Sequence, residues 1–302
     1  MHVVVTGGSG FIGRHVVARL LVRGDDVVVA DLHPFPSPSV ACVVGDLRDP
    51  GVVARALAPG TDAVVHLAAI TSVLRSAQEP HAVFQTNVDA TELLLERCRA
   101  LGVGRFVFAS TNAVAGDVGA GTIDENVLPR PLTPYGATKA AAEMLFFAYA
   151  ASYGFTTVVL RFTNVYGAGM QSKDSVVARL MRCAVKGGTI QIYGDGEQRR
   201  DYVYVTDTVA AVEIGLALGR AETLTIGAGR SVSMNELWHT ACAVTGVEIG
   251  AEHVAAKPGE MPAVVVDTSR ARSLGYAPAY DLRAGLAATW EDFRANGAGR
   301  AD

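Results

Sequence analysis

The first half of the chain alternates short apolar runs with longer segments of helical periodicity. The short runs are rich in β-branched residues and cover residues 2–6, 26–30, 63–68, 105–109 and 156–160. Their length and composition predict strands that are buried on both faces. The longer segments repeat apolar residues every three or four positions and cover 12–24, 50–60, 86–103 and 134–154. They predict helices between parallel strands, and so an α/β fold with a Rossmann-type doubly wound parallel sheet.

Beyond Arg161 the pattern becomes less regular. A helix is predicted over residues 175–188, a turn-rich stretch over 193–205, and a further helix after Thr206. We therefore expect two domains. The first is a Rossmann domain over residues 1–165 that also receives a segment near 200–222, and the second is a smaller C-terminal α/β domain over 166–302.

Composition narrows the class of partner. The chain has 302 residues, half of them hydrophobic, and a formal net charge of -4. It carries no electrostatic footprint for nucleic acid or an anionic membrane, which favours a small-molecule partner. The four cysteines show no C-x-x-C spacing, and the apolar start "MHVVVTGG" is too short for a signal sequence or a membrane span. A cytoplasmic enzyme is expected.

The first loop carries the strongest local signal. "TGGSGFIG" places Gly7, Gly10 and Gly13 at three-residue spacing between a predicted strand and a predicted helix. This arrangement brings backbone amides and a helix N-terminus to a dinucleotide pyrophosphate. Asp31 ends the second strand, where a carboxylate binds the adenosine ribose hydroxyls and repels a 2'-phosphate. Since "LHPFP" follows without an arginine, NAD is favoured over NADP.

A second motif lies in "LTPYGATKAAAEML". Tyr135 and Lys139 are four residues apart near the start of the predicted helix, so both side chains project on the same side. Thr133 is suited to cap that helix and Pro134 to occupy its first position.

Read together, these motifs resemble the extended short-chain dehydrogenase/reductase superfamily. Matching pieces are "GDL" at 45–47, "HLAA" at 66–69, "NV" at 87–88, "RFTNVYG" at 161–167, "IYGDGEQRRDYVYVTD" at 192–207 and "DTSRARSLGY" at 267–276. In order and content the set is most similar to the NAD-dependent nucleotide-sugar epimerase/dehydratase family, on the side of the UDP-glucose 4-epimerases. The resemblance spans nearly the whole chain.

The resemblance implies roles for the Y-x-x-x-K pair. Tyr135 would be the general base toward a sugar hydroxyl while NAD accepts hydride from the same carbon, and Lys139 would also bind the nicotinamide ribose. We expect the helix dipole, Lys139, the oxidised nicotinamide and desolvation to lower the pKa of Tyr135 from ~10 toward neutrality, which needs about 4 kcal/mol. Thr111 would hydrogen-bond the reacting oxygen, with Ser110 as the weaker candidate for that role and a simple strand end as the alternative for Thr111.

Further contacts follow by resemblance alone. The first domain would bind NAD and the second mainly a nucleotide sugar. Cofactor contacts are expected from Gly7, Gly10, Phe11, Ile12, Gly13, Asp31, Leu32, Asp46, Leu47, Leu67, Ala68, Ala69, Asn87, Ser110, Tyr135, Lys139 and Phe162. Substrate contacts are expected from Thr71, Thr111, Asn112, Asn164, Arg200, Lys257 and Glu260. Asn164 and Arg200 would contact the diphosphate, and Lys257 stands where these epimerases usually carry arginine.

Several positions separate reactions and substrates. Sugar 4,6-dehydratases of the superfamily carry Asp-Glu after the threonine, whereas Asn112 and Ala113 stand here. Ala115 replaces the usual tyrosine, which suggests a roomier wall. Val264 either leaves room for an N-acetylated sugar or is simply packed core. A uronate substrate needs a cation soon after "VYG", where "AGMQSKDS" offers only Lys173.

No metal is expected, because the histidines form no ligand pair and His66 in its apolar run is better read as a core residue. The sequence thus predicts an NAD-dependent nucleotide-sugar 4-epimerase of carbohydrate metabolism, an isomerase acting on a UDP-hexose. The alternatives are a UDP-glucuronate epimerase or decarboxylase, a net NAD-dependent oxidoreductase and a non-catalytic binding protein. The resemblance also implies a homodimer that pairs through helices 86–101 and 135–152.

Overall fold

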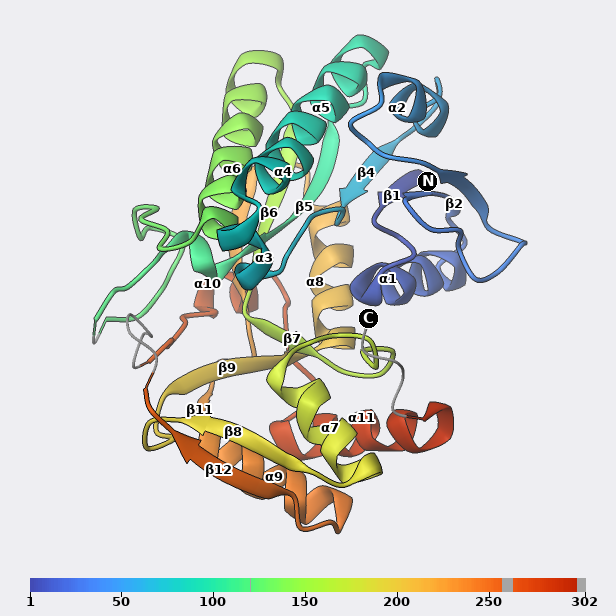
Figure 1. Ribbon diagram of the computed structural model, residues 1–302. Coiled ribbons are helices and arrows are strands. Elements are labelled where there is room, and N and C mark those ends of the chain that lie inside the picture. Colours follow the sequence, from blue (N-terminus) through green and yellow to red (C-terminus); the bar gives the residue numbers. More distant parts are fainter. Residues whose placement is uncertain (120, 257–262, 298–302) are drawn as a thin grey trace. The chain divides into compact units, whose positions relative to one another are not determined.

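The computed structural model describes residues 1–119, 121–256 and 263–297 (Figure 1). The chain forms two compact units. The first contains residues 1–117, 125–162 and 209–224, and the second contains 118–124, 163–208 and the chain from 225 onward. The predicted division by role, with its boundary at residue 165, stays a prediction.

The first unit is built on a seven-stranded sheet in the order β10-β6-β5-β4-β1-β2-β3. Its strands are β1 (His2–Thr6), β2 (Asp26–Asp31), β3 (Ala41–Val44), β4 (Ala63–His66), β5 (Arg105–Thr111), β6 (Thr156–Phe162) and β10 (Glu222–Ile226). The neighbouring pairs from β6 to β3 are parallel. The strand order turns back at β1, as in doubly wound sheets, so the predicted fold class is confirmed.

Helices cover both faces of this sheet. They are α1 (Phe11–Val22), α2 (Pro50–Ala56), α3 (Val73–Gln78), α4 (Pro80–Phe84), α5 (Ala90–Leu101), α6 (Pro134–Tyr153) and α8 (Val205–Ala217). Helix α5 lies between α2 and α6 on one face (Figure 1). On the other face α1 and α8 are joined by the ion pair of Arg19 with Glu213, at 2.8 Å.

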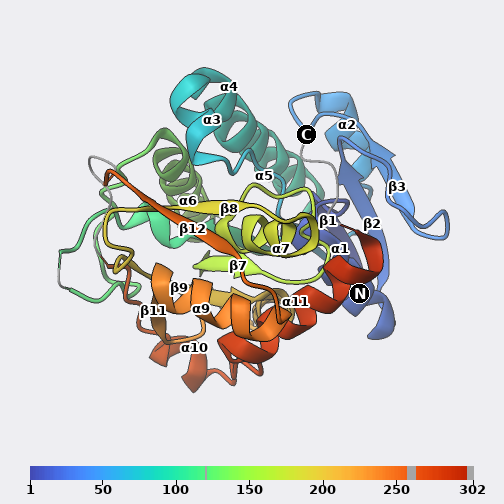
Figure 2. The ribbon, with the colours of Figure 1, turned by 60° about the horizontal axis from the view of Figure 1, so that its bottom comes forward.

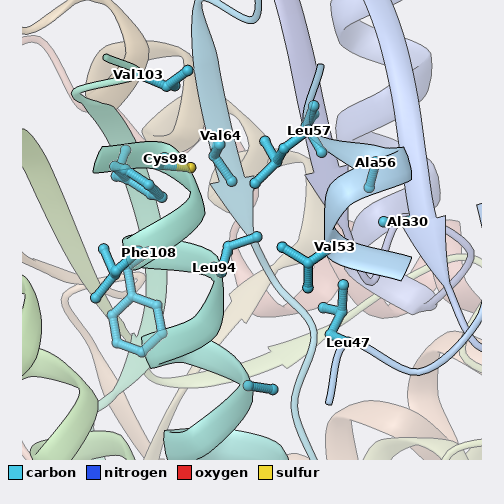
Figure 3. Packing of buried hydrophobic residues seen from close by; sticks show 14 of the residues in the cluster. Ala30, Leu47, Val53, Ala56, Leu57, Val64, Leu94, Cys98, Val103 and Phe108 are labelled. Atoms are coloured by element: carbon cyan, nitrogen blue, oxygen red, sulfur yellow. The ribbon is translucent and has the colours of Figure 1, made fainter. Parts of the chain in front are cut away.

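The core of the first unit lies between the sheet and helices α2, α5 and α6. Val53 and Ala56 of α2, Leu94 of α5 and Val64 of β4 point toward one another there (Figure 3). All four are nearly inaccessible to solvent. This burial of the helices' apolar stripes fixes α5 and α6 against the sheet.

The described residues of the second unit form two small sheets and four helices, which Figure 2 shows from another side. Its elements are β7 (Asn164–Tyr166), β8 (Thr189–Tyr193), β9 (Arg199–Tyr204), β11 (Ser231–Ser233), β12 (Gly250–Val254), α7 (Val176–Lys186), α9 (Met234–Thr245), α10 (Ser269–Ser273) and α11 (Leu282–Asn296). The sheets have the orders β11-β9-β7 and β12-β8. Helices α7, α9 and α11 contact one another.

Two sequence predictions need correction, and one strand was missed. The stretch 193–205, predicted as turn-rich, contains strand β9, whose residues from position 201 onward are buried. The predicted helix 86–103 begins as a π-helix, η1 (Gln85–Asp89), before α5. The short edge strand β3 was not predicted. In the part of the chain that the structure describes, no helix is long and apolar enough to cross a membrane.

Candidate active site

The glycine loop between β1 and α1 is shaped by close backbone contacts. Gly7 has φ of +70°, and a Cβ there would lie 2.7 Å from the backbone N of Ala68. A Cβ on Gly13 would lie 2.2 Å from the carbonyl oxygen of Gly7. Gly10 is the N-cap of α1, and none of the described side chains caps that helix. The first turn therefore presents amides that fit a dinucleotide pyrophosphate.

Asp31 lies beside this loop at the end of β2. Its Oδ2 accepts a hydrogen bond from the Ser9 backbone N–H and its Oδ1 accepts one from the His33 backbone N–H, both at 3.0 Å. Each oxygen retains a second lone pair for ribose hydroxyls. Among the other predicted cofactor residues, Asp46 is held by the Arg48 guanidinium, which lowers the pKa of its carboxyl.

Asn87, in the π-helix, links the loop after β4 to helix α6. Its Oδ1 accepts from the Ile70 N–H at 2.8 Å, while its Nδ2 donates to Ile70 O and to Thr138 Oγ1, both at 3.0 Å. Thr138 in turn donates to the carbonyl oxygen of Tyr135 at 2.8 Å. The structure therefore shows Asn87 as a bridge within the protein, and its predicted contact with the cofactor stays a prediction.

Helix α6 begins as the sequence predicts. The Thr133 hydroxyl accepts from the Gly136 N–H at 3.1 Å, and Pro134 stands in the first turn. A Cβ on Gly136 would lie 2.7 Å from the carbonyl oxygen of Ala113. Only glycine allows this approach, which brings the first turn of α6 to the end of β5.

Tyr135 and Thr111 meet at that junction. Their hydroxyls share a hydrogen bond, which lowers the pKa of Tyr135, but burial has the larger effect and raises this pKa to about 12. The prediction that desolvation helps to lower the pKa was wrong in sign, because a low-dielectric site disfavours the charged phenolate. Ionisation of Tyr135 must therefore depend on positive charge nearby.

Lys139 lies one helical turn beyond Tyr135 and is 3% exposed. Its Nζ is 4.2 Å from the centroid of the Phe108 ring, a cation–π contact. Burial lowers the pKa of Lys139 to about 7, and the Glu143 carboxylate acts in the opposite direction. Near neutral pH this ammonium is therefore poised between its charged and neutral forms.

A buried ion pair, not anticipated from the sequence, lies one further turn along α6. The Glu143 Oε2 is 2.8 Å from Nη2 of Arg161 on β6, and the Ser110 hydroxyl donates to Glu143 Oε1. Glu143 is fully buried and Arg161 is 3% exposed. The sequence did hold a signal, since "AAAEMLFF" places one carboxylate in an apolar segment four residues after Lys139.

His66 is a core residue, as predicted. It is 1% exposed, with Nδ1 at 2.6 Å from Thr6 Oγ1 and Nε2 at 2.9 Å from Thr91 Oγ1. Burial lowers its pKa to about 3, with Lys139 contributing in the same direction, so the imidazole is neutral at pH 7. Among the described residues no group of His, Cys, Asp and Glu is arranged to hold a metal ion.

In the second unit, two predicted substrate residues flank a buried aspartate. Asn164 Nδ2 donates to the backbone oxygen of Asp201 at 2.9 Å, and Arg200 precedes Asp201 on β9. The Asp201 carboxylate accepts from the Thr163 hydroxyl and from three consecutive backbone N–H groups at 228–230. It thereby fixes the loop after β10.

The remaining predicted substrate residues divide between the two units and the undescribed part of the chain. Thr71 and Asn112 lie in the first unit, in the segments that follow β4 and β5. Lys257 and Glu260 lie outside the described residues. Val264 is 1% exposed and bonded through its backbone to Arg199 and Ser231, which favours packed core over an open wall.

The doubly wound sheet, the glycine loop with Asp31 and the Tyr135–Lys139 helix define an α/β enzyme that uses a dinucleotide. Residues 3–227 match the model of the NAD dependent epimerase/dehydratase family, so the chain belongs to this family. NAD is therefore its cofactor, as Asp31 predicts. The protein is an NAD-dependent nucleotide-sugar epimerase/dehydratase family enzyme.

Individual relatives differ in reaction and substrate. The dTDP-glucose 4,6-dehydratase of Streptomyces griseus is 36% identical, with 95% of this chain and 92% of the relative aligned. The crystal structure of the Thermus thermophilus UDP-glucose 4-epimerase with NAD is 34% identical, with a TM-score of 0.92 over 98% of this chain and 100% of that one. MoeE5 in complex with UDP-glucuronic acid and NAD is 36% identical, with a TM-score of 0.90 over 98% and 99%.

Proposed function

We propose that the protein is an NAD-dependent nucleotide-sugar 4-epimerase, an isomerase that inverts C4 of a UDP-hexose through a transient 4-keto sugar. The observation that carries this proposal is the set of side chains where the end of β5 meets the start of α6. Thr111 is hydrogen-bonded to Tyr135 and Lys139 lies one turn on, while the two positions after Thr111 are Asn112 and Ala113, which carry no titratable group.

The glycine loop, the amides of the first turn of α1 and the Asp31 carboxylate fit a dinucleotide, and we assign them to NAD. The other first-unit residues predicted to contact it, from Leu67 to Phe162 along the sheet edge, are part of this proposal. When bound there, NAD would supply a reversible hydride acceptor for the sugar carbon.

The protein's own side chains transfer the proton to and from the sugar O4. Tyr135 takes the proton from the sugar O4 as the alcohol is oxidised, and gives it back when the ketone is reduced. Thr111 can donate to or accept from the same oxygen, so it holds both the alcohol and the ketone. Burial of Tyr135 disfavours its phenolate form. The positive charge of Lys139 stabilises that phenolate.

The dehydratase reaction of the Streptomyces griseus relative needs more groups than this junction offers. Elimination of water from C5 and C6 requires an acid and a base in addition to the tyrosine. Asn112 and Ala113, the first residues of a 3₁₀ turn after β5, supply neither. This difference favours inversion over elimination.

A UDP-glucuronate epimerase or decarboxylase is the second candidate. The observation that favours it is the likeness to MoeE5, which was solved with UDP-glucuronic acid. A C6 carboxylate calls for a cation, and in the segment after β7 the sequence supplies Lys173. A lone lysine lacks the bidentate geometry of arginine, which makes the neutral hexose the better fit.

The second unit would grip the nucleotide diphosphate through Asn164 and Arg200, together with Lys257 and Glu260, while Thr71 and Asn112 would contact the sugar. We further propose a homodimer that pairs through α5 and α6. Met144, Phe147 and Tyr153 on α6 are 48%, 37% and 53% exposed. Large apolar side chains on a long helix favour such a symmetric contact.

The test is a product assay. Purified, NAD-loaded protein is incubated in turn with UDP-glucose, UDP-N-acetylglucosamine, UDP-glucuronate and dTDP-glucose, and products are resolved by proton NMR. The proposal predicts C4 inversion of a neutral UDP-hexose without net NADH. Inversion or carbon dioxide release with UDP-glucuronate alone would support the second candidate. A 4-keto-6-deoxy product, or stoichiometric NADH, would contradict both.

A further inference from the structure

The Glu143 cluster, defined as Glu143 with Ser110 and Arg161, connects the three elements that carry the site. Ser110 and Arg161 are Cα partners in the parallel register of β5 and β6. The Ser110 hydroxyl and the Arg161 guanidinium both donate hydrogen bonds to the Glu143 carboxylate of α6. One carboxylate therefore ties α6 to two adjacent strands, at the level just below Thr111.

The cluster also lies next to Lys139. Tyr135, Lys139 and Glu143 follow one another at intervals of four residues, so they share one face of α6. Lys139 Nζ contacts the ring of Phe108, which stands two residues before Ser110 on β5. Lys139 therefore lies between the proton-transferring tyrosine and the carboxylate.

The titratable groups around Lys139 come from several elements. Glu143 and Tyr135 belong to α6 itself, His66 to β4 and Arg161 to β6. Helix η1 faces α6 with the neutral Asn87, and the ionisable side chains of α3 and α4, Arg75 and His81, are exposed. Glu96 of α5 meets α6 more than two turns further on, at Tyr149.

We propose that Glu143 is a positioning residue for the Tyr135–Lys139 pair: it locks α6 onto β5 and β6 and supplies negative charge that favours the protonated form of Lys139. Burial alone drives the pKa of Lys139 down, and Glu143 is the group that raises it. A neutral Lys139 could not stabilise a phenolate at Tyr135. This inference rests on the proposed function only because that function uses the phenolate form of Tyr135 as a base.

A nearby carboxylate offers a matched control. Glu96 accepts from the Tyr149 hydroxyl of α6 and pairs with Arg99 at 2.7 Å, just as Glu143 accepts from a hydroxyl and pairs with an arginine. Glu96 lies toward the other end of α6. Glu96→Gln therefore removes the same chemical group from a contact with the same helix without touching the surroundings of Lys139.

The experiment measures protonation of Lys139 directly. The chain contains only four lysines, Lys139, Lys173, Lys186 and Lys257. Labelling lysine with carbon-13 at Cε gives few NMR signals, and Lys139→Met identifies the one from Lys139. The signal is followed from pH 5 to pH 10 in wild type, Glu143→Gln and Glu96→Gln, with circular dichroism confirming that each variant is folded.

In Glu143→Gln we expect the midpoint of the Lys139 titration to fall by about one pH unit, a tenfold weaker proton affinity, because an opposite charge nearby is lost. Glu96→Gln should leave the midpoint unchanged. In turnover assays the alkaline limb of the kcat profile should move the same way, with KM for the nucleotide sugar preserved. A folded Glu143→Gln whose Lys139 titrates as in wild type would overturn the proposal.

If Glu143→Gln does not fold, the double variant Glu143→Leu/Arg161→Met replaces the ion pair by apolar side chains, an exchange that is often neutral for stability. Its Lys139 midpoint should also fall, since the carboxylate is gone. An unchanged midpoint, or failure of both variants to fold, would assign the cluster to stability alone. The NMR titration needs no substrate. Absence of epimerase turnover would therefore contradict the proposed function without deciding this inference.

Discussion

Glu143 in the first unit and Asp201 in the second are both fully buried carboxylates, yet they are compensated in different ways. Glu143 is paired with the guanidinium of Arg161. Asp201 accepts from a threonine hydroxyl and from three backbone N–H groups, and all four of these donors are neutral. Despite these donors, burial raises the pKa of the Asp201 carboxyl.

These different partners give the two carboxylates different roles. Neutral amides satisfy the oxygens of Asp201 but provide no full positive charge, so that residue shapes a loop beside Asn164 and Arg200. Glu143 is paired with Arg161 and raises the pKa of Lys139, so it can influence the chemistry of the site. We therefore expect changes in the first region to alter kcat and its pH dependence, and changes in the second to alter stability and KM.

The largest effect is expected from Tyr135→Phe. Loss of the proton-transferring hydroxyl should lower kcat by about a thousandfold, which is typical for removal of a general base. Tyr149→Phe, on the same helix, is the matched control and should stay within a few-fold of wild type. Steady-state assays with UDP-glucose compare them, and a Tyr135→Phe enzyme with more than a tenth of wild-type kcat would refute the assigned role.

Gly136→Ala tests whether close approach of α6 to β5 matters. The added Cβ meets the Ala113 carbonyl and the Pro131 ring, so the first turn must shift and carry Tyr135 with it. We expect kcat to fall by about 10- to 100-fold, as for small misplacements of a catalytic group. Gly219→Ala places its Cβ in open space and should be neutral. Equal kinetics for the two variants would show that the approach has no catalytic consequence.

Asp201→Asn probes the other region. An amide NH₂ would face backbone N–H donors, leaving buried groups unsatisfied, at a cost of about 2 kcal/mol in the free energy of unfolding. KM for the nucleotide sugar should rise, while the Lys139 titration should not move. Asp195→Asn, at an exposed turn, serves as the control in denaturant unfolding. A shifted Lys139 midpoint in Asp201→Asn would break the contrast between the two carboxylates.

Lys139→Met should show a pH-dependent gain in stability. The pKa of Lys139 falls from 10.5 to about 7 on folding, so the unfolded chain binds the proton more tightly. The wild-type protein is therefore penalised at and below pH 7, and the penalty disappears as pH rises toward 10.5. Urea unfolding at pH 7 should find Lys139→Met more stable by at least about 1 kcal/mol, with the difference shrinking toward pH 10. A pH-independent difference would contradict the depressed pKa.

The sheet, its crossover helices and the capped start of α6 were predictable because they depend on local patterns. Strand β9 was not, since its first three residues, Arg199, Arg200 and Asp201, are charged and resemble a turn. The edge strand β3 has only four residues. These segments become strands through pairing with neighbours, which local composition does not report.

Within the site, Tyr135, Lys139 and Thr111 were recognised from spacing and resemblance. The Glu143 cluster was missed because the strand register brings together Ser110 and Arg161, which are far apart in the sequence. The effect of desolvation on the pKa of Tyr135 was also predicted with the wrong sign. Spacing shows that two groups share a helix face, but the depth of burial that controls their charge is set by tertiary packing.

The proposed reaction is a redox-neutral inversion in which the sugar loses and regains the same hydrogen. It is tested most directly by running the reaction of NAD-loaded enzyme with UDP-glucose in D₂O and recording proton NMR spectra of the product. Redox-neutral inversion predicts a C4-inverted UDP-hexose that retains protium at C4 and C5. A new methyl signal, or deuterium at C5, would reveal elimination of water and would contradict it.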